Sequence, residues 1–360
     1  MDKPIRIAQV VGKIVQGGVD TVVMNYYRNI DRNLVQFDFF SDGLEPTFHD
    51  DEILKLGGKI YRLPPYDKGM LANLRAFREI LKENNYQIIH SHMSTLSPFW
   101  LREAKKAGIP IRIAHSHTTA SIAEGKRVLA KYMLRPFSRV YPTHLITCSQ
   151  YSGEWLFGKK SPMYIMRNAI NIEKFRFNQD IRNKVHSDLG IEGKFVVGHV
   201  GRFVNQKNHH FLINSFYQAL AQDPNLLLLL IGDGELRKDV ETQIHNLGIS
   251  GSVILLGNRD DMSNLYQAMD VFVLPSIFEG LSVACVEAQN SGLPCILSTS
   301  VSTETALSDH VKFIPLKEEM WVNAILSAKA NNKRIDPPVV NEFDIQNSAP
   351  KLCDYYLSLL

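Results

Sequence analysis

Two carboxylates eight positions apart, Glu279 and Glu287, are the residues of this 360-residue sequence that most suggest chemistry. Glu287 is the only charge in the apolar run 283–288. A carboxylate in such surroundings needs a partner, and paired sugar hydroxyls suit its acceptor oxygens well. A salt bridge to a neighbouring helix is the alternative. The pattern favours a carboxylate that binds a sugar.

The segment between the two carboxylates has the features of an anion site. Ser282 is a suitable N-cap for a helix, and the loop before it follows a strand that ends near Leu274. Backbone N–H groups at a helix N-terminus point toward phosphate oxygens. We therefore expect backbone contacts to phosphate from Gly280, Leu281 and Ser282.

Two cations follow an earlier strand of the same half. Arg202 stands just after the strand-like run 195–200, and Lys207 opens the next helical stretch. Arginine clamps two oxygens and lysine acts as a mobile point charge, so together they suit a diphosphate. Either residue alone reads equally well as a solvated surface charge. The pair predicts a diphosphate site.

Paired glycines, Gly17 and Gly18, stand between the first strand-like run and a helical stretch. They let the backbone approach a ligand closely, and the following helix directs N–H groups at an anion. An ordinary strand-to-helix turn is an equal alternative. The sequence lacks G-x-G-x-x-G, which disfavours a nicotinamide dinucleotide.

Four histidines form two His-x-His pairs, each after a strand: His90 with His92, and His115 with His117. Such pairs are common metal ligands, so a metal site is one interpretation. No Asp or Glu lies within or beside either pair, so a mixed ligand set would need distant partners. Two more histidines, His209 and His210, are interpreted as helix-surface residues.

Alternating strand-like and helix-like stretches position all of these residues. Aliphatic runs such as Ile5–Val11 and Leu226–Ile231 alternate with amphipathic stretches such as Met70–Asn84. This alternation predicts parallel sheets covered by helices on both faces. Two such series predict two doubly wound α/β domains, joined within 168–179. Ligands of such sheets bind beyond the carboxyl ends of the strands.

Composition narrows the classes of function. A hydrophobic content of 45% with 21% charged residues fits two folded domains. The net charge of +3 argues against a nucleic-acid binder, although residues 1–172 carry 24 Lys and Arg against 15 Asp and Glu. That basic half is expected to meet something anionic. The four cysteines form no C-x-x-C pair, and Cys148, Cys285 and Cys295 lie in or beside apolar stretches, which predicts free buried thiols in a reducing compartment. Without a visible signal or spanning segment, we expect a cytoplasmic location.

Together, these motifs resemble the retaining glycosyltransferases of family 4. The resemblance rests on the E-x7-E spacing, the two cations and the glycine pair described above. It extends to the segments 148–149, 167–170 and 232–236, and so covers nearly the whole chain. It is greatest to bacterial enzymes that build exopolysaccharide or capsule repeat units.

The resemblance implies the GT-B architecture, in which two Rossmann-like domains face a cleft. Residues 1–170 would bind the acceptor, and a helix at 343–360 would cross back to them. Residues 171–342 would bind the nucleotide sugar. By family habit the donor would be UDP-linked and the acceptor a glycan or a lipid-linked saccharide.

The same resemblance assigns roles around the donor. Arg202 and Lys207 would bind the diphosphate, and Glu287 the ribose hydroxyls. Asn258 lies in a segment that is commonly near the base, and the loops at Gly17–Gly18 and 280–282 would also contact the donor. Because two cations neutralise the diphosphate, we expect turnover without a metal ion or another cofactor.

Catalysis would rest on a few of these groups. Glu279 would contact the donor sugar, so no dedicated nucleophile is evident, and a front-face mechanism follows, in which the leaving phosphate accepts the acceptor's proton. The two cations would stabilise the departing charge. His115 matches the family's active-site histidine and would donate a hydrogen bond to a sugar hydroxyl or orient the acceptor. The expected catalytic set is His115, Glu279, Arg202 and Lys207.

The basic segment 126–139 is a candidate membrane contact. Arg127, Lys131 and Arg135 share one helical face among apolar residues, and Pro136 ends or kinks the helix. Such a helix suits an anionic bilayer surface, which would place the enzyme on the inner face of the plasma membrane. A solvated helix face is the alternative.

Three other classes of function stay open. A nucleotide-sugar epimerase would share the fold and the diphosphate site but use no acceptor. A metal hydrolase would hold zinc on the four histidines. A catalytically silent binding protein would take up the donor and release none of its sugar.

Overall fold

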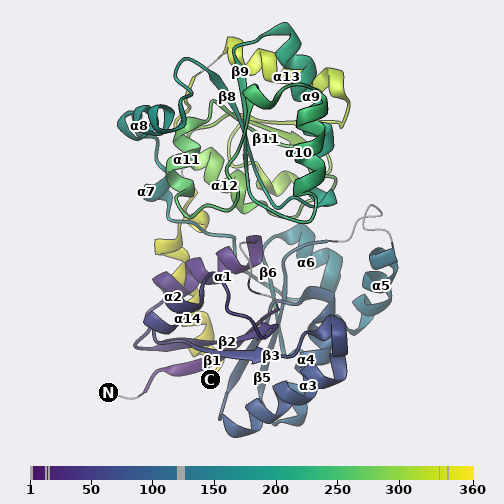
Figure 1. Ribbon diagram of the computed structural model, residues 1–360. Helices are drawn as coiled ribbons and strands as arrows, with labels where there is room; N and C mark the ends of the chain where they lie inside the picture. The colour runs from purple at the N-terminus through teal and green to yellow at the C-terminus, as the bar shows by residue number, and fades with distance from the viewer. Residues whose placement is uncertain (1–2, 13, 15–16, 120–125, 332, 339) are drawn as a thin grey trace. The chain divides into compact units, whose positions relative to one another are not determined.

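The computed structural model describes residues 3–12, 14, 17–119, 126–331, 333–338 and 340–360. The chain divides into two compact units. The first unit comprises the chain up to Ala169 together with Asn341–Leu360, and the second unit comprises Ile170–Val340. Each unit is a parallel sheet with helices on both faces (Figure 1), so the predicted pair of doubly wound α/β domains is confirmed.

Within the described residues, the sheet of the first unit has seven strands in the order β3-β2-β1-β4-β5-β6-β7. Their bounds are β1 Ile5–Gly12, β2 Val35–Asp42, β3 Lys59–Leu63, β4 Ile88–Ser91, β5 Ile111–Ser116, β6 His144–Thr147 and β7 Tyr164–Ile165. The α-helices are α1 Gly18–Asn29, α2 Asp50–Lys55, α3 Tyr66–Glu83, α4 Ser97–Lys106, α5 Lys126–Leu134, α6 Gln150–Phe157 and α14 Ile345–Ser358.

The described part of the second unit has a six-stranded sheet in the order β10-β9-β8-β11-β12-β13. Its strands are β8 Phe195–Val200, β9 Leu226–Ile231, β10 Val253–Leu255, β11 Val271–Leu274, β12 Cys295–Ser298 and β13 Val311–Ile314. Its α-helices are α7 Ile172–Phe175, α8 Gln179–Leu189, α9 His209–Gln222, α10 Arg237–Asn246, α11 Met262–Ala268, α12 Val283–Asn290 and α13 Glu318–Ala330.

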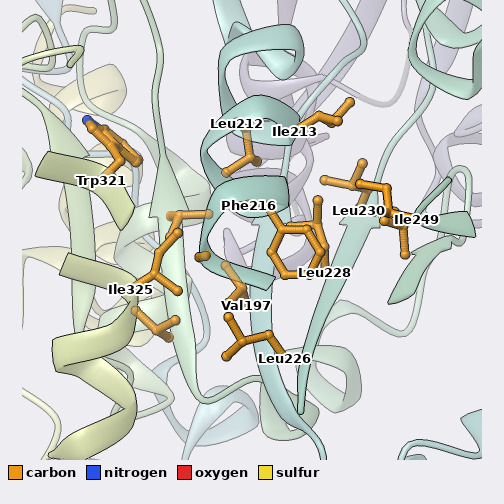
Figure 2. Packing of buried hydrophobic residues seen from close by; sticks show 14 of the residues in the cluster. Val197, Leu212, Ile213, Phe216, Leu226, Leu228, Leu230, Ile249, Trp321 and Ile325 are labelled. Atoms are coloured by element: carbon orange, nitrogen blue, oxygen red, sulfur yellow. The ribbon is translucent and has the colours of Figure 1, made fainter. Parts of the chain in front are cut away.

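The core of the second unit explains why its strands read as continuous apolar runs. Every residue of β9 is buried, because helices cover both faces of the sheet. On one face, Leu212 and Phe216 of α9 and Ile325 of α13 pack against alternate strand residues such as Leu228 (Figure 2). These contacts hold the carboxyl ends of the strands in a fixed register.

Both sheets contain a topological switch point, where the strand order reverses. The chain leaves β1 toward β2 and β3 on one side and later adds β4 on the other; β8 and β11 are related in the same way. Loops diverge at such a point and leave space beyond the strand ends, which is where ligands of these sheets bind.

The last helix belongs to the first unit. Asp344 caps α14, with its side chain accepting from the backbone N–H of Gln346, so the helix begins two residues after the expected start at 343. It packs beside α1 (Figure 1), and the Gln346 amide donates to Asn29 Oδ1 at 2.9 Å. The predicted return of the chain to its first unit is confirmed.

The cysteines and the lengths of the helices concern two further predictions from the sequence. All four cysteines are free and buried. Among the described residues, no helix is both long and apolar enough to cross a membrane.

Candidate functional site

The structure brings Lys207 and Glu279 together at the switch point of the second unit. Lys207 ends a short 3-10 turn, 205–207, after β8, and Glu279 lies in the loop after the neighbouring strand β11. The Lys207 Nζ lies 2.6 Å from Glu279 Oε2, and both side chains are more than four-fifths buried. The Ser276 hydroxyl donates to the same carboxylate oxygen at 3.3 Å. The two candidate residues thus form an ion pair.

Glycines allow the lysine to lie against the backbone. A Cβ on Gly201 would lie only 3.0 Å from the Lys207 Cδ. Gly232, which follows β9, has φ +130°, and a Cβ there would lie 2.2 Å from the Gly201 carbonyl oxygen. Only glycine fits this backbone conformation and close approach. The loops after β8 and β9 are therefore in close contact at Gly201 and Gly232, next to the Lys207 side chain.

Arg202 lies in the same loop as Lys207, two residues after the end of β8, and is exposed. In the part of the chain that the structure describes, no hydrogen bond or ion pair engages its guanidinium. The loop after β8 thus carries two cations, Lys207 paired with Glu279 and Arg202 exposed. The arrangement can receive an anion without first breaking an arginine contact.

Glu287 lies in α12 and is 8% exposed. The Tyr266 hydroxyl donates to its Oε2 at 2.9 Å. Burial raises the pKa of Glu287 to about 7, opposed by the Tyr266 hydrogen bond and the charge of Lys174. No ion pair to Glu287 occurs among the described residues, so the salt bridge considered above is replaced by a hydrogen bond to a tyrosine.

The loop before α12 is held from two sides. Glu279 forms a parallel bridge with Val301, and the Gly280 carbonyl accepts from the Thr305 hydroxyl at 3.3 Å. Ser282 is the N-cap of α12, as expected, its hydroxyl accepting from the backbone N–H of Cys285 at 3.4 Å. Gly280, Leu281 and Ser282 therefore lie directly before the helix, and all three are buried.

Asn258 and the glycine pair occupy separate strand ends. Asn258 is exposed in the loop after β10. This loop contacts the loop after β9, because the Gly232 N–H donates to the Gly257 carbonyl at 2.8 Å. Gly17 caps α1 in the first unit, and Gly18 opens that helix. The neighbouring loop residues 13, 15 and 16 lie outside the described residues.

The switch point of the first unit holds all four histidines of the two His-x-His pairs. His90 and His92 come from β4 and the residue after it, and His115 and His117 from β5 and its end. All four are buried, with 0–9% exposure. Two hydrogen-bonded pairs link the strands: His90 Nε2 with His115 Nδ1 at 3.1 Å, and His92 Nδ1 with His117 Nε2 at 2.8 Å.

Gln9 and Tyr356, from β1 and α14, complete this cluster. Gln9 of β1 contacts His92 Nε2 through Oε1 at 2.9 Å, and the hydroxyl of Tyr356 in α14 contacts His90 Nδ1 at 2.7 Å. The Gln9 Nε2 donates to the Tyr356 hydroxyl at 3.4 Å. Neither residue was a sequence candidate, because nothing local links positions 9 and 356 to the histidine pairs.

A metal interpretation fits this cluster less well than a hydrogen-bond network. Ring nitrogens of His90, His92 and His115 lie within 4.8 Å of one another. Hydrogen bonds, however, already engage both nitrogens of His90 and of His92. Burial lowers the pKa of all three rings well below 6.5, and that of His117 to about 3. The cluster is therefore a set of neutral imidazoles.

The surface interpretation of His209 is wrong. Its ring is 1% exposed and packs on Phe203, with centroids 4.2 Å apart, and edge-on to His199. Burial lowers the pKa of His209 to about 2. The adjacent His210 is exposed as expected and hydrogen-bonds to Gln243 through Nδ1 at 2.5 Å.

Comparison with known proteins gives the family. A model described as Glycosyltransferase Family 4 matches residues 16–174, and one described as Glycosyl transferases group 1 matches residues 181–336. The putative glycosyltransferase EpsF of Bacillus subtilis is 34% identical over 90% of this chain and 88% of its own length. An Escherichia coli enzyme named UDP-Gal:alpha-D-GlcNAc-diphosphoundecaprenol alpha-1,3-galactosyltransferase is 28% identical over 81% of this chain and 80% of its own.

Solved structures agree on the fold. HepE of Anabaena, crystallised with UDP-glucose, superposes with a TM-score of 0.81 at 19% identity, covering 99% of this chain and all of that chain. The apo form of the lipopolysaccharide outer core galactosyltransferase WaaB gives a TM-score of 0.68 at 18% identity, over 99% and 100% of the two chains. From this fold and these relatives, the chain belongs to the family 4 retaining glycosyltransferases, GT-B enzymes that use nucleotide-sugar donors.

Proposed function

We propose that this enzyme transfers a hexose from a UDP-sugar to a lipid-linked saccharide during assembly of a bacterial polysaccharide. The observation that carries the donor site is the grouping of Arg202, Lys207 and Glu279 at the switch point of the second unit. A cation without a protein partner beside a lysine held by a carboxylate is suited to a diphosphate that bears a sugar. The second unit then binds the donor and the first unit the acceptor.

The remaining contacts follow from the same placement. Glu287 accepts hydrogen bonds from the ribose hydroxyls, and Asn258 lies near the base. The backbone before α12, at Gly280, Leu281 and Ser282, contacts the phosphates, and Gly17 and Gly18 of the first unit are further candidate donor contacts. Burial that holds the pKa of Glu287 near 7 makes ribose binding dependent on its ionisation.

The proposed mechanism is front-face displacement without a metal ion. When the donor binds, its diphosphate competes with Glu279 for Lys207, which frees the carboxylate to contact the sugar. Arg202 and Lys207 then stabilise the charge that develops as the diphosphate leaves. The leaving phosphate accepts the acceptor's proton, and His115 donates a hydrogen bond to a sugar hydroxyl.

The choice of UDP and of the pathway draws on relatives. The Escherichia coli relative is named for UDP-galactose and a diphosphoundecaprenol acceptor, and HepE was crystallised with UDP-glucose. Relatives named for capsular polysaccharide biosynthesis occur in Staphylococcus aureus, and one of them spans 98% of this chain at 20% identity. These names support a role in polysaccharide assembly.

Calorimetric titration of UDP, GDP and ADP, with and without magnesium, tests the donor site. We expect one nucleotide, UDP, to bind equally well in both conditions. Arg202→Ala and Glu287→Ala should each weaken that binding by about tenfold. Failure of all three nucleotides to bind would refute the proposed transfer. Turnover that a chelator abolishes and manganese restores would refute the metal-free mechanism.

A second proposal concerns the segment 126–139. In α5 and the following turn, Leu129 and Met133 are 65% and 67% exposed, and Phe137 and Val140 are also exposed. Lys131, Arg135 and Arg139 lie among them, while the side chains of Lys126 and Arg127 lie outside the described residues. An exposed apolar surface with basic residues suits an anionic bilayer. We expect sedimentation with vesicles containing phosphatidylglycerol and less with phosphatidylcholine vesicles; equal sedimentation would remove the electrostatic part.

A further inference from the structure

We propose that Gln9 and Tyr356 are positioning residues that hold His115 in the tautomer with its proton on Nε2. In that form the ring offers a hydrogen-bond donor and no acceptor at Nε2. The catalytic meaning rests on the proposed function, in which His115 faces the donor sugar. The assignment of the proton rests only on contacts within the first unit.

Each ring of the cluster carries one proton. All four imidazoles are buried, and within the described residues no carboxylate contacts them. Burial, with mutual repulsion between the rings, keeps their pKa values low. In a neutral ring one nitrogen donates and the other accepts. The partner of one nitrogen therefore decides the role of the other.

Gln9 sets the direction of both chains of hydrogen bonds. Its Oε1 can only accept, so His92 Nε2 at 2.9 Å must carry a proton. Its Nε2 can only donate, so the Tyr356 hydroxyl at 3.4 Å accepts from it. The two ends of one amide thus impose opposite roles on two neighbours.

The Tyr356 hydroxyl passes this direction to His115. Having accepted from Gln9, it donates its own proton to His90 Nδ1 at 2.7 Å. His90 must then carry its proton on Nε2, which donates to His115 Nδ1 at 3.1 Å. With Nδ1 accepting, the single proton of His115 stands on Nε2.

The second chain shares only Gln9 with the first. His92, with its proton on Nε2, accepts at Nδ1 from His117 Nε2 at 2.8 Å. This chain ends on His117 and does not involve His115. Its state provides an internal reference in the same molecule, because a change at Tyr356 should leave it unaltered.

The His115 Nε2 is buried and has no hydrogen-bond partner among the described residues. A buried N–H without a partner is costly, so such a group is kept where a ligand oxygen will meet it. An Nε2–H can bind a hydroxyl or phosphate oxygen but cannot remove a proton from an acceptor. His115 therefore acts as a hydrogen-bond donor through Nε2 and not as a general base.

The direct test is nitrogen-15 NMR of the full chain with labelled histidine, free of ligand. Single His→Gln variants assign each ring. We expect the His115 Nε2 to show the shift of a protonated nitrogen and its Nδ1 that of an acceptor, from pH 6.5 to 8. A protonated Nδ1, or a mixture of tautomers in the wild type, would overturn the inference.

Tyr356→Phe removes the relay, and Tyr355→Phe is its control. Tyr355 is the neighbouring residue of α14 and stacks on Tyr164, away from the histidines. We expect Tyr356→Phe to convert His115 to a mixture of tautomers, to leave His117 unchanged and to lower kcat for hydrolysis of UDP-glucose by about five- to tenfold. Its affinity for UDP should stay within twofold of the wild type, and Tyr355→Phe should change neither spectrum nor rate.

The outcomes separate the two proposals. An unchanged His115 spectrum in folded Tyr356→Phe would refute the relay and leave the donor site standing. The expected spectra without UDP binding to the wild type would refute the proposed function and leave the tautomer assignment standing. The wild-type spectrum alone can overturn the inference, so the test does not depend on whether a variant folds.

Discussion

The two switch points of this enzyme share a topology and differ in chemistry. In the second unit the strand ends carry charge, with Lys207 paired to Glu279 and Arg202 in the same loop as Lys207. In the first unit the strand ends carry neutral rings, joined by Gln9 and Tyr356. The same backbone geometry thus presents charged groups in one unit and neutral hydrogen-bonding groups in the other. The fold supplies the position, and side chains at a few strand ends supply the selectivity.

The largest effect should come from removing the cation of the charged site. Lys207→Ala removes charge stabilisation of the leaving diphosphate. It also leaves the Glu279 carboxylate without its ion-pair partner. We expect kcat/KM to fall by about 10²- to 10³-fold. Lys238→Ala, an exposed lysine of α10, is the control and should stay within twofold of the wild type. A loss below tenfold for Lys207→Ala would contradict the assignment.

Glu287→Gln should move stability and binding in opposite directions. The pKa of Glu287 is raised to about 7 in the folded protein, so its ionisation costs stability as the pH rises from about 4.5 through 7. The neutral variant escapes this cost. We expect it to exceed the wild type by about 3 kcal/mol at pH 8 and to match it near pH 4.

Denaturant unfolding at several pH values measures this difference, and UDP titration of the same variant measures binding. Binding should weaken by about tenfold at pH 8. A variant that is less stable than the wild type at pH 8 would show that the carboxylate is a structural partner of Tyr266 and not a strained ligand group.

Glu279→Gln should separate binding from transfer. Without the carboxylate charge, Lys207 is no longer neutralised, so UDP should bind about tenfold more tightly. Sugar transfer should nevertheless slow, since the contact of Glu279 with the donor sugar is lost. Titration of UDP and a steady-state assay report the two effects. Weaker binding of UDP would show that the ion pair does not compete with the diphosphate.

The neutral cluster should give an effect that is small near neutral pH and grows as the pH falls. Burial lowers the pKa of His117 to about 3, so the unfolded chain takes up a proton first as the pH falls below about 6.5. Each such histidine removes about 1.4 kcal/mol of stability per pH unit below that point. His117→Gln should therefore flatten the slope by that amount. Hydrogen exchange resolved by unit checks this, and an unchanged slope in the first unit would contradict it.

Sequence reasoning located the fold because the relevant signals are local. Runs such as Leu226–Ile231 are buried on both faces, and this burial is visible in composition alone. Ser282 was recognisable as an N-cap from its place before an apolar run, and the structure has it in that role. The carboxyl ends of the strands, and so the candidate residues, followed from this pattern.

What could not be predicted depends on contacts between distant residues. Tyr266 binds Glu287 across 21 positions and Tyr356 binds His90 across 266, and neither spacing leaves a periodic trace. The sequence suggests a surface position for His209, because this polar residue stands at the start of a helix. That prediction is wrong, because Phe203 and His199 pack against its ring. The donor and acceptor roles of the candidates stay predictions, since they concern molecules that sequence patterns do not specify.

The position of α14 has a consequence for how the protein is made. Its helix completes the first unit, yet it follows the second unit in the chain, so the ribosome synthesises all of Ile170–Val340 before it. At about 5–20 residues per second, those residues take roughly 10 to 30 s. During that interval the nascent first unit lacks Tyr356 and the apolar cover of α1. The face of α1 that packs against α14 therefore stays uncovered until the whole second unit has been synthesised.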